Sequence, residues 1–253
     1  MKFRILVVLA FFSSFNLFAQ KVTVVSPDKK INIGLFNTKN GDCGEWFLKV
    51  SYMNNGNVTE AIPQIILGLS RADQDFSKEL KYLKNSKVTS INENYTALHG
   101  KRTNCSNSAN ETVVAFENPG KAKMNLFIRA YNDGIAFRYE FPEKSGSFVM
   151  NDELTTYAIP DSTRRWLEKF NPANEALYTS MKDGSIQQDW AYPALFNTQD
   201  NACWYLIHEA DLNRNYCATK LSNAADKNKY KTTFPDQWNG RGTGESKPTI
   251  TLP

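Results

Sequence analysis

A β-hairpin is the strongest local feature of this 253-residue sequence, and it constrains the fold class. In residues 124–141, "MNLFIRAYNDGIAFRYEF", apolar residues alternate on both sides of Asn132-Asp133-Gly134. A period of two places these side chains on one face of each strand. Asn-Asp-Gly supplies residues that tolerate positive φ, which predicts a tight turn. The charges of Arg129, Arg138 and Glu140 are expected on the opposite face, with cross-strand pairing.

Short strands separated by turn signals are predicted along most of the chain. Apolar alternation or apolar runs recur at 22–24, 31–35, 46–52, 64–70, 177–180, 194–196, 203–209 and 216–221. Residues 73–110 are polar and poorly patterned, which favours loops around one or two exposed strands. Only 162–170, where Trp166 and Phe170 have helical spacing, favours a short helix. The expected fold is all-β, a large antiparallel, supersandwich-like β-sandwich with very little helix.

The first 19 residues have the pattern of a secretory signal peptide. Lys2 and Arg4 flank the start of an almost wholly apolar run over 5–12, and Ala19 precedes the expected cleavage point. The alternative is a membrane anchor, but the run is shorter than the roughly 20 residues needed to span a bilayer. Export without a membrane anchor is predicted. Residues 20–253 then form the domain, with 224–253 as a loop-rich tail.

Charge and cysteine content exclude some classes of function. The formal net charge is +4, and it falls to +2 without Lys2 and Arg4, so nothing recruits nucleic acid. No C-x-x-C pair suggests a zinc site. In an exported chain, four cysteines allow three disulfide pairings, and the sequence does not choose among them. They are Cys43, Cys105, Cys203 and Cys217.

Histidine is too scarce for the common catalytic centres. The chain has only His99 and His208, and neither lies in a motif typical of a serine or cysteine nucleophile. A zinc centre meets the same shortage. The glycines of 240–244 lack the preceding strand and following helix of a phosphate-binding loop, so they indicate a flexible loop. No catalytic residue is assigned.

Glu209 continues an otherwise apolar strand face in "YLIHEADL", residues 205–212. On a strand, Cys203, Tyr205, Ile207 and Glu209 point one way, while Trp204, Leu206 and His208 point the other way. An unpaired buried carboxylate costs several kcal/mol. From the residues alone three outcomes stay open, which are exposure at the end of the strand, an ion pair, or a metal ion.

Three segments resemble the N-terminal domain of glycoside hydrolase family 97, a family of bacterial α-glucosidases and α-galactosidases. They are "SPDKKINIGL" near the mature start, "RAYNDGIAFRYEFP" at 129–142 and "HEADL" at 208–212. The resemblance implies a three-part enzyme with an N-terminal β-sandwich, a central (β/α)₈ barrel and a small C-terminal β domain. With the leader, it also implies export to the periplasm or cell surface of a Gram-negative bacterium.

The resemblance also implies a calcium ion in the active site, held mainly by glutamates. One of these reaches in from the N-terminal domain, and the matching position is Glu209. Ca²⁺ takes six to eight oxygen ligands, so the other carboxylates would come from the barrel. The expected partners are therefore a catalytic barrel domain and a carbohydrate, an α-glucoside or α-galactoside.

The chain departs from the family where the barrel would begin. It ends at "SKPTITLP", and a (β/α)₈ barrel alone needs roughly 250 residues. Glycoside hydrolysis requires two carboxyl groups around the scissile bond, and in this family both belong to the barrel. The expectation is a truncated, non-catalytic chain that is inactive alone and leaves an apolar patch exposed where a barrel would dock.

Two further hypotheses remain. A free-standing carbohydrate-binding module would need exposed aromatic rings, for which Trp190, Tyr192 and Trp238 are candidates because their sequence context is polar. An unaided enzyme would need Glu209, Asp211 and His208 to act together. His208 faces away from Glu209 on a regular strand, which argues against that hypothesis.

Overall fold

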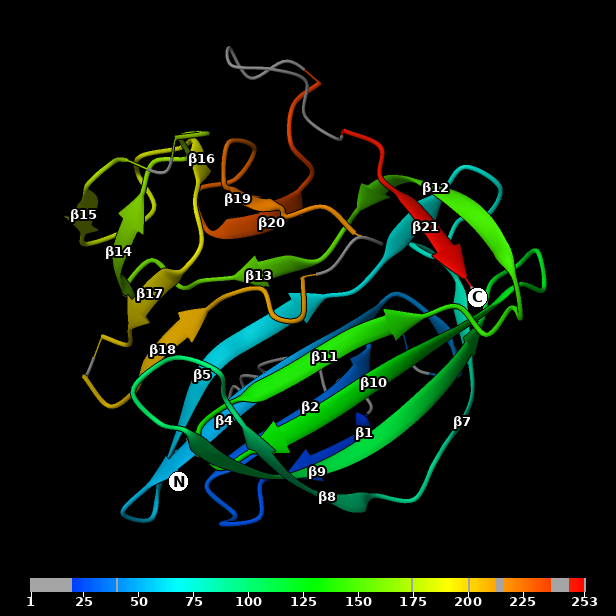
Figure 1. The fold of residues 1–253 in the computed structure, drawn as a ribbon, viewed down its shortest axis with the longest axis horizontal. Coiled ribbons are helices and arrows are strands. Elements are labelled where there is room, and N and C mark those ends of the chain that lie inside the picture. Colours follow the sequence, from blue (N-terminus) through cyan, green and yellow to red (C-terminus); the bar gives the residue numbers. More distant parts are fainter. Residues whose placement is uncertain are drawn as a thin grey trace, which may run out of the picture.

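A computed structural model describes residues 20–39, 41–173, 175–199, 201–212, 216–237 and 246–252. Every regular element in these ranges is a β-strand, and the paired strands are antiparallel (Figure 1). The expected all-β class is confirmed. No helix in the described part of the chain is long and apolar enough to cross a membrane. The predicted signal peptide, residues 1–19, lies outside the described residues.

The largest sheet has eight strands in the order β1-β2-β4-β5-β13-β20-β19-β16. Their bounds are β1 Gln20–Val25, β2 Ile31–Asn37, β4 Trp46–Asn54, β5 Asn57–Ile66, β13 Thr156–Ala158, β20 Lys229–Thr233, β19 Lys220–Ser222 and β16 Asp189–Trp190. Its first four strands follow the chain order, so local hairpins build that half. The other half recruits strands from distant parts of the sequence.

The second sheet has six strands and contains the expected hairpin. Its order is β11-β10-β9-β7-β3, with β8 also paired to β9. The bounds are β3 Cys43–Gly44, β7 Leu80–Asn85, β8 Thr89–Thr96, β9 Asn104–Glu117, β10 Lys123–Tyr131 and β11 Ile135–Glu140. The turn closes where the Tyr131 N–H donates to the Gly134 carbonyl at 2.8 Å. It does so without positive φ at Asn132, Asp133 or Gly134, which differs from the expectation.

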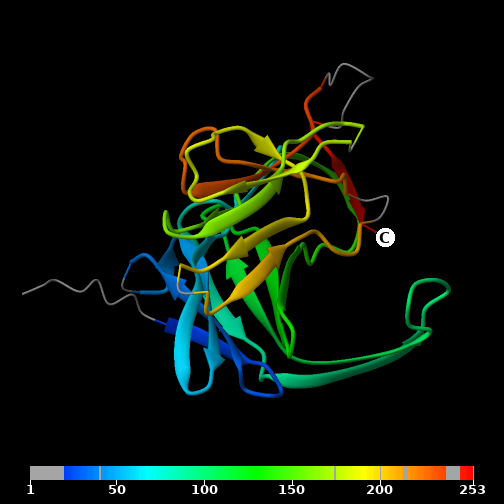
Figure 2. The ribbon, with the colours of Figure 1, turned by 90° about the vertical axis from the view of Figure 1, so that its left-hand side faces the viewer.

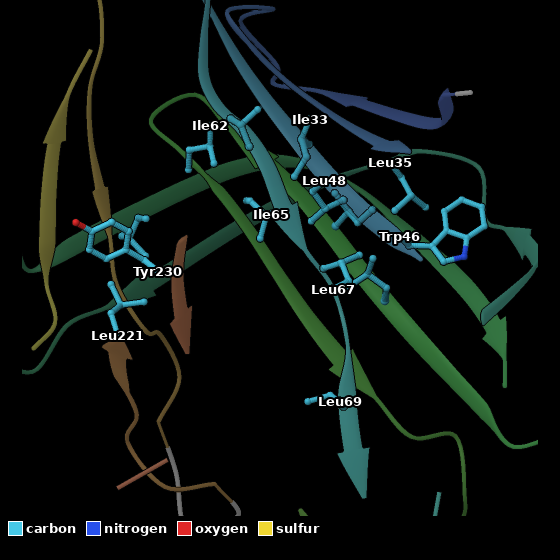
Figure 3. Close-up of a cluster of buried hydrophobic side chains, with 14 of the residues drawn as sticks. Ile33, Leu35, Trp46, Leu48, Ile62, Ile65, Leu67, Leu69, Leu221 and Tyr230 are labelled. Atoms are coloured by element: carbon cyan, nitrogen blue, oxygen red, sulfur yellow. The ribbon is translucent and has the colours of Figure 1, made fainter. Parts of the chain in front are cut away.

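The core lies between these two sheets. Trp46, Leu48 and Val50 share the buried face of β4, as the alternation predicts. Leu126 and Ile128 of β10 belong to the same hydrophobic cluster. Figure 3 shows part of this cluster, including Trp46 and Leu48. On the outer face of β10, Arg129 pairs with Glu111, its cross-strand neighbour on β9. Packed apolar faces inside and paired charges outside are what a β-sandwich requires.

Two smaller sheets flank the sandwich. One has the order β15-β14-β17-β18, and the other β21-β12-β6. Their bounds are β15 Tyr178–Met181, β14 Arg164–Glu168, β17 Ala194–Asn197, β18 Trp204–Ile207, β21 Thr249–Leu252, β12 Gly146–Glu153 and β6 Leu69–Arg71. In Figure 1 the two sheets lie at opposite sides of the molecule.

The helix expected over 162–170 is wrong, because these residues form β14. Arg165 and Leu167 point inward and are fully buried, while Trp166 between them points outward. The buried guanidinium donates to the Thr163 and Ile159 carbonyls at 2.8 and 3.2 Å. The alternation of inward and outward residues along β14 was not visible in the hydrophobicity pattern, because one of the two inward residues is an arginine.

Two described parts of the tail over 224–253 are strands, which differs from the expected loops. β20 lies inside the eight-stranded sheet, where it pairs with β13 and β19. β21 pairs with β12, with Ile250 opposite Phe148. The expected loop-rich tail therefore contributes strands to two sheets.

β8 and β9 extend beyond the sandwich as a two-stranded arm, which Figure 2 shows reaching away from the body of the molecule. The pairing runs from Thr89 opposite Glu111 to Thr96 opposite Asn104. Most of β8 is exposed, and Leu98 at the tip is 96% exposed. This agrees with the exposed strands expected within 73–110.

None of the three possible disulfide pairings forms. Each of the three pairings joins all four cysteines in two disulfides. Because the thiols of Cys43, which is exposed, and Cys105, which is half-buried, are free, no such pairing is complete.

Candidate functional site

Strand β18 carries the chain to Glu209. It pairs with β17 along its length, from Asn197 opposite Trp204 to Ala194 opposite Ile207. Ile207 is buried, whereas Trp204 and Leu206 are 52% and 56% exposed, so the predicted alternation is confirmed. The strand ends at Ile207, and Glu209 lies two residues beyond it. The acid is therefore on the loop that leaves the sheet.

Thr219 holds the carboxylate of Glu209. Its N–H donates to Oε1 at 3.0 Å and to Oε2 at 3.2 Å, and its hydroxyl donates to Oε1 at 2.5 Å. Glu209 is half-buried. Within the described residues its hydrogen bonds come from Thr219 and not from an arginine or lysine. Among the described residues, the carboxylate is therefore neither fully exposed nor paired with a cation. Hydrogen bonds from Thr219, which directly precedes β19, stabilise it instead.

A second acid, Glu153 at the end of β12, reaches the same segment through Tyr216. The Tyr216 hydroxyl donates to Glu153 Oε2 at 2.5 Å. Burial raises the pKa of the Glu153 carboxyl, and the charge of Glu209 raises it further, although the Tyr216 hydrogen bond acts against both. The carboxylates of Glu153 and Glu209 therefore accept hydrogen bonds from the first and last residues of the segment 216–219.

Both acids line one large cavity of about 1240 Å³. Several tyrosines contribute to its wall, and four of them are Tyr139, Tyr157, Tyr192 and Tyr216. Burial raises the pKa of all four hydroxyls, so they are protonated donors at neutral pH. The wall thus combines aromatic surface and hydroxyl donors with carboxylates, among them those of Glu153 and Glu209.

The residues present fit one ligand of a hard cation but not a complete site. A carboxylate is the oxygen donor that Ca²⁺ prefers, and Oε2 of Glu209 accepts only the longer of the Thr219 N–H hydrogen bonds. Six to eight oxygens are needed. In the described residues no group of three or more His, Cys, Asp or Glu side chains could hold a metal ion.

The neighbours of Glu209 do not assemble into acid–base machinery. His208 is exposed, and its ring meets Tyr192 edge-on at 6.2 Å between centroids. Asp211 is exposed and has a φ of 57°, a conformation that Asp tolerates in turns. Asp211 therefore lies on the segment that follows β18, with its side chain exposed.

The aromatic residues predicted for sugar binding differ in their exposure. Trp190 is 1% exposed, and its indole N–H donates to Asn223 Oδ1 at 2.9 Å, so it offers no face to a ligand. Its polar sequence context concealed a core residue whose partner lies far along the chain. Tyr192 is half-buried in the cavity wall. Trp238 lies outside the described residues.

Apolar side chains are exposed around Glu209. Trp204 and Leu206 precede it, and Leu212, which is 51% exposed, follows it. All three line the cavity that contains Glu209. We refer to Leu206 and Leu212, which are both exposed, as the apolar rim of this cavity.

Sequence reasoning missed Glu153, Tyr216 and Thr219. They lie 56, 7 and 10 positions from Glu209, and no local pattern connects them. Thr219 directly precedes β19, whereas Glu153 ends β12. Only the pairing of these strands with distant partners brings the three residues together.

Three comparisons place the chain among known proteins. The family model described as "Glycosyl-hydrolase 97 N-terminal" matches residues 24–248. A probable retaining alpha-galactosidase of Streptomyces bingchenggensis is 27% identical over 172 residues, which cover 68% of this chain and 26% of that protein.

Solved structures of glycoside hydrolases contain a domain with the same fold. A beta-arabinopyranosidase superposes with a TM-score of 0.81 at 27% identity, covering 92% of this chain and 38% of that one. A glycoside hydrolase family 97 enzyme from Pseudoalteromonas sp. strain K8, in complex with acarbose, shares the fold with a TM-score of 0.73 at 22% identity, covering 91% and 34%. The chain thus spans between about a quarter and two fifths of these relatives' length. It belongs to the family of glycoside hydrolase family 97 N-terminal domains.

Proposed function

We propose that this chain is the non-catalytic N-terminal domain of a calcium-dependent α-glycosidase. In this proposal it packs on a (β/α)₈ barrel and contributes Glu209 to the metal ion of the carbohydrate site. The substrate would be an α-glucoside or an α-galactoside, and the enzyme would be exported to the periplasm or cell surface. The chain alone would not hydrolyse glycosides.

The position of Glu209 is the observation that carries this proposal. The acid lies beyond the end of a strand, lines a large cavity and is held by Thr219, with exposed apolar residues on both sides. A carboxylate held for the chain's own stability would more simply be paired with a cation. Here one oriented oxygen ligand sits at an apolar rim, which suits a site completed by a second domain.

Calcium would supply positive charge that stabilises negative charge developing during glycoside hydrolysis. The contribution of this chain would be to present the Glu209 carboxylate, and to exclude water with the apolar rim. Thr219 fixes the carboxylate, and Tyr216 anchors the segment that contains Thr219.

Terbium luminescence tests the role of Glu209. Tb³⁺ replaces Ca²⁺ in oxygen sites and emits when a nearby tyrosine or tryptophan is excited, and this cavity holds several tyrosines. The purified chain should sensitise Tb³⁺, and Ca²⁺ should compete with a dissociation constant on the order of 1 mM, because the ligand set is incomplete.

Matched variants decide the outcome. Glu209→Gln should abolish the emission, whereas Asp211→Asn, an exposed acid two residues away, should leave it unchanged. Emission that survives Glu209→Gln would refute the assignment. Micromolar competition by Ca²⁺ would show a complete site on this chain, against the need for a second domain.

The alternative of a free-standing carbohydrate-binding module loses one of its candidate residues, because Trp190 is buried.

A further inference from the structure

The sheet β15-β14-β17-β18 has two unlike faces. Its inner face packs into the core through Leu167 and Phe196, both fully buried. Its outer face carries Trp166 of β14 and Trp204 of β18, on either side of β17. Neither indole is needed to fill the core, and half of the Trp204 side chain remains exposed at 52%.

The two indoles form a rigid platform. Their ring centroids are 4.8 Å apart with an interplanar angle of 29°, so they stack across β17. The Trp204 indole N–H donates to Asn201 Oδ1 at 2.9 Å, which fixes its orientation. Stacking covers one face of each ring, and the exposure of Trp204 leaves aromatic surface available to a ligand.

Polar groups surround this platform. A pocket of about 400 Å³, within the range of small-ligand sites, is lined by both indoles and by Arg164, Lys182, Asn197, Gln199 and Asn201. The amides offer both donors and acceptors, and the two cations offer donors only. Arg164 and Lys182 are exposed, so they can turn toward a bound molecule.

We propose that this Trp166–Trp204 pocket binds a neutral oligosaccharide. A pyranose ring has an apolar face of C–H groups that stacks on an indole, and a rim of hydroxyls that bond with amides. The pocket supplies both features on one sheet face. It uses neither Glu209 nor Thr219, and only Trp204 also lines the Glu209 cavity, so its test does not depend on the proposed calcium role.

Indole N–H resonances in NMR spectra of the purified chain provide the test. Maltotriose and melibiose, an α-glucoside and an α-galactoside, would be titrated to about 20 mM, above a dissociation constant on the order of 1 mM. At least one sugar should shift the Trp166 and Trp204 resonances saturably. The resonances of Trp46 and Trp190, both 1% exposed, should stay in place as internal controls.

Variants separate stacking from folding. Trp204→Ala should raise the dissociation constant about tenfold, and Trp204→Phe should keep most of the affinity. Gln199→Ala, an exposed change that does not threaten the fold, should weaken binding about threefold. Tyr95→Ala removes another half-exposed aromatic ring, on the β8–β9 arm, and should change nothing.

The proposal fails if neither sugar shifts the Trp166 and Trp204 resonances. It also fails if the shifts are confined to other tryptophans, or if a folded Trp204→Ala chain binds as well as the native chain.

Discussion

At the scale of single residues, Glu153 is the most consequential acid that the sequence did not reveal. It is half-buried, it lines the cavity, and burial raises its pKa even though Tyr216 donates a hydrogen bond to its carboxylate. Retaining a carboxyl group at such a position costs stability whenever it ionises. Its effect on stability must therefore depend on pH.

The sign of that dependence follows from the raised pKa. The folded state holds the Glu153 proton more tightly than the unfolded state, so this residue favours folding below the unfolded pKa. The contribution is lost as pH rises from about 4.5 through the folded pKa. Glu153→Gln mimics the protonated acid, so it should match the native chain at pH 4 and be the more stable protein at pH 7. Urea unfolding at the two pH values measures the difference.

An equal effect of Glu153→Gln at both pH values would contradict the raised pKa. If Glu153→Gln were less stable than the native chain at pH 7 but not at pH 4, the pKa of Glu153 would be lowered and not raised.

At the scale of elements, the predictable strands are those whose inward residues are all apolar. β10 is such a strand, since Met124, Leu126, Ile128 and Ala130 are buried as the alternation predicts. β14 was not predictable, because its inward Arg165 obtains its partners from backbone carbonyls that only the fold brings near.

The site divides in the same way. The position of Glu209 after an apolar strand could be read from local alternation and from the family resemblance. Its holder Thr219 could not, since a hydrogen bond across ten residues depends on where β18 ends and β19 begins. The burial of Trp190 likewise depends on Asn223, 33 positions away.

The β8–β9 arm should be the first segment that a protease cuts. Its tip between the two strands contains Lys101 and Arg102, both exposed, and exposed loop tips are preferred sites of cleavage. Brief trypsin treatment, followed by mass spectrometry, should give one early cut there while the melting temperature stays within about 2 °C of the intact chain. A Lys101→Gln, Arg102→Gln chain should resist that cut. Early cleavage inside the sandwich instead would contradict the arrangement.

At the scale of the whole molecule, the apolar rim of the Glu209 cavity should make the isolated chain associate. Leu206 and Leu212 expose apolar area beside a cavity of about 1240 Å³. Exposed apolar surface beside a cavity is often covered by another protein surface. Hiding it from water is favourable by roughly 25 cal/mol per Å².

Sedimentation velocity over a concentration series should therefore show reversible association of the native chain. Replacing Leu206 and Leu212 with lysine should shift the population toward monomer. Val58→Lys, at a site 70% exposed in β5, serves as the control and should leave association unchanged. A native chain that stays strictly monomeric at high concentration would count against a docking role for this rim.

The hydrogen bonds from Thr219 have a further consequence for binding affinity. A mobile glutamate loses up to about 2 kcal/mol of rotamer entropy when it is fixed in one orientation. Because Thr219 already restricts Glu209, folding of this chain bears that entropy loss before any ligand arrives. A cation or neighbouring domain that meets this carboxylate encounters a preorganised acceptor, and the free energy of that encounter goes into binding and not into ordering a side chain.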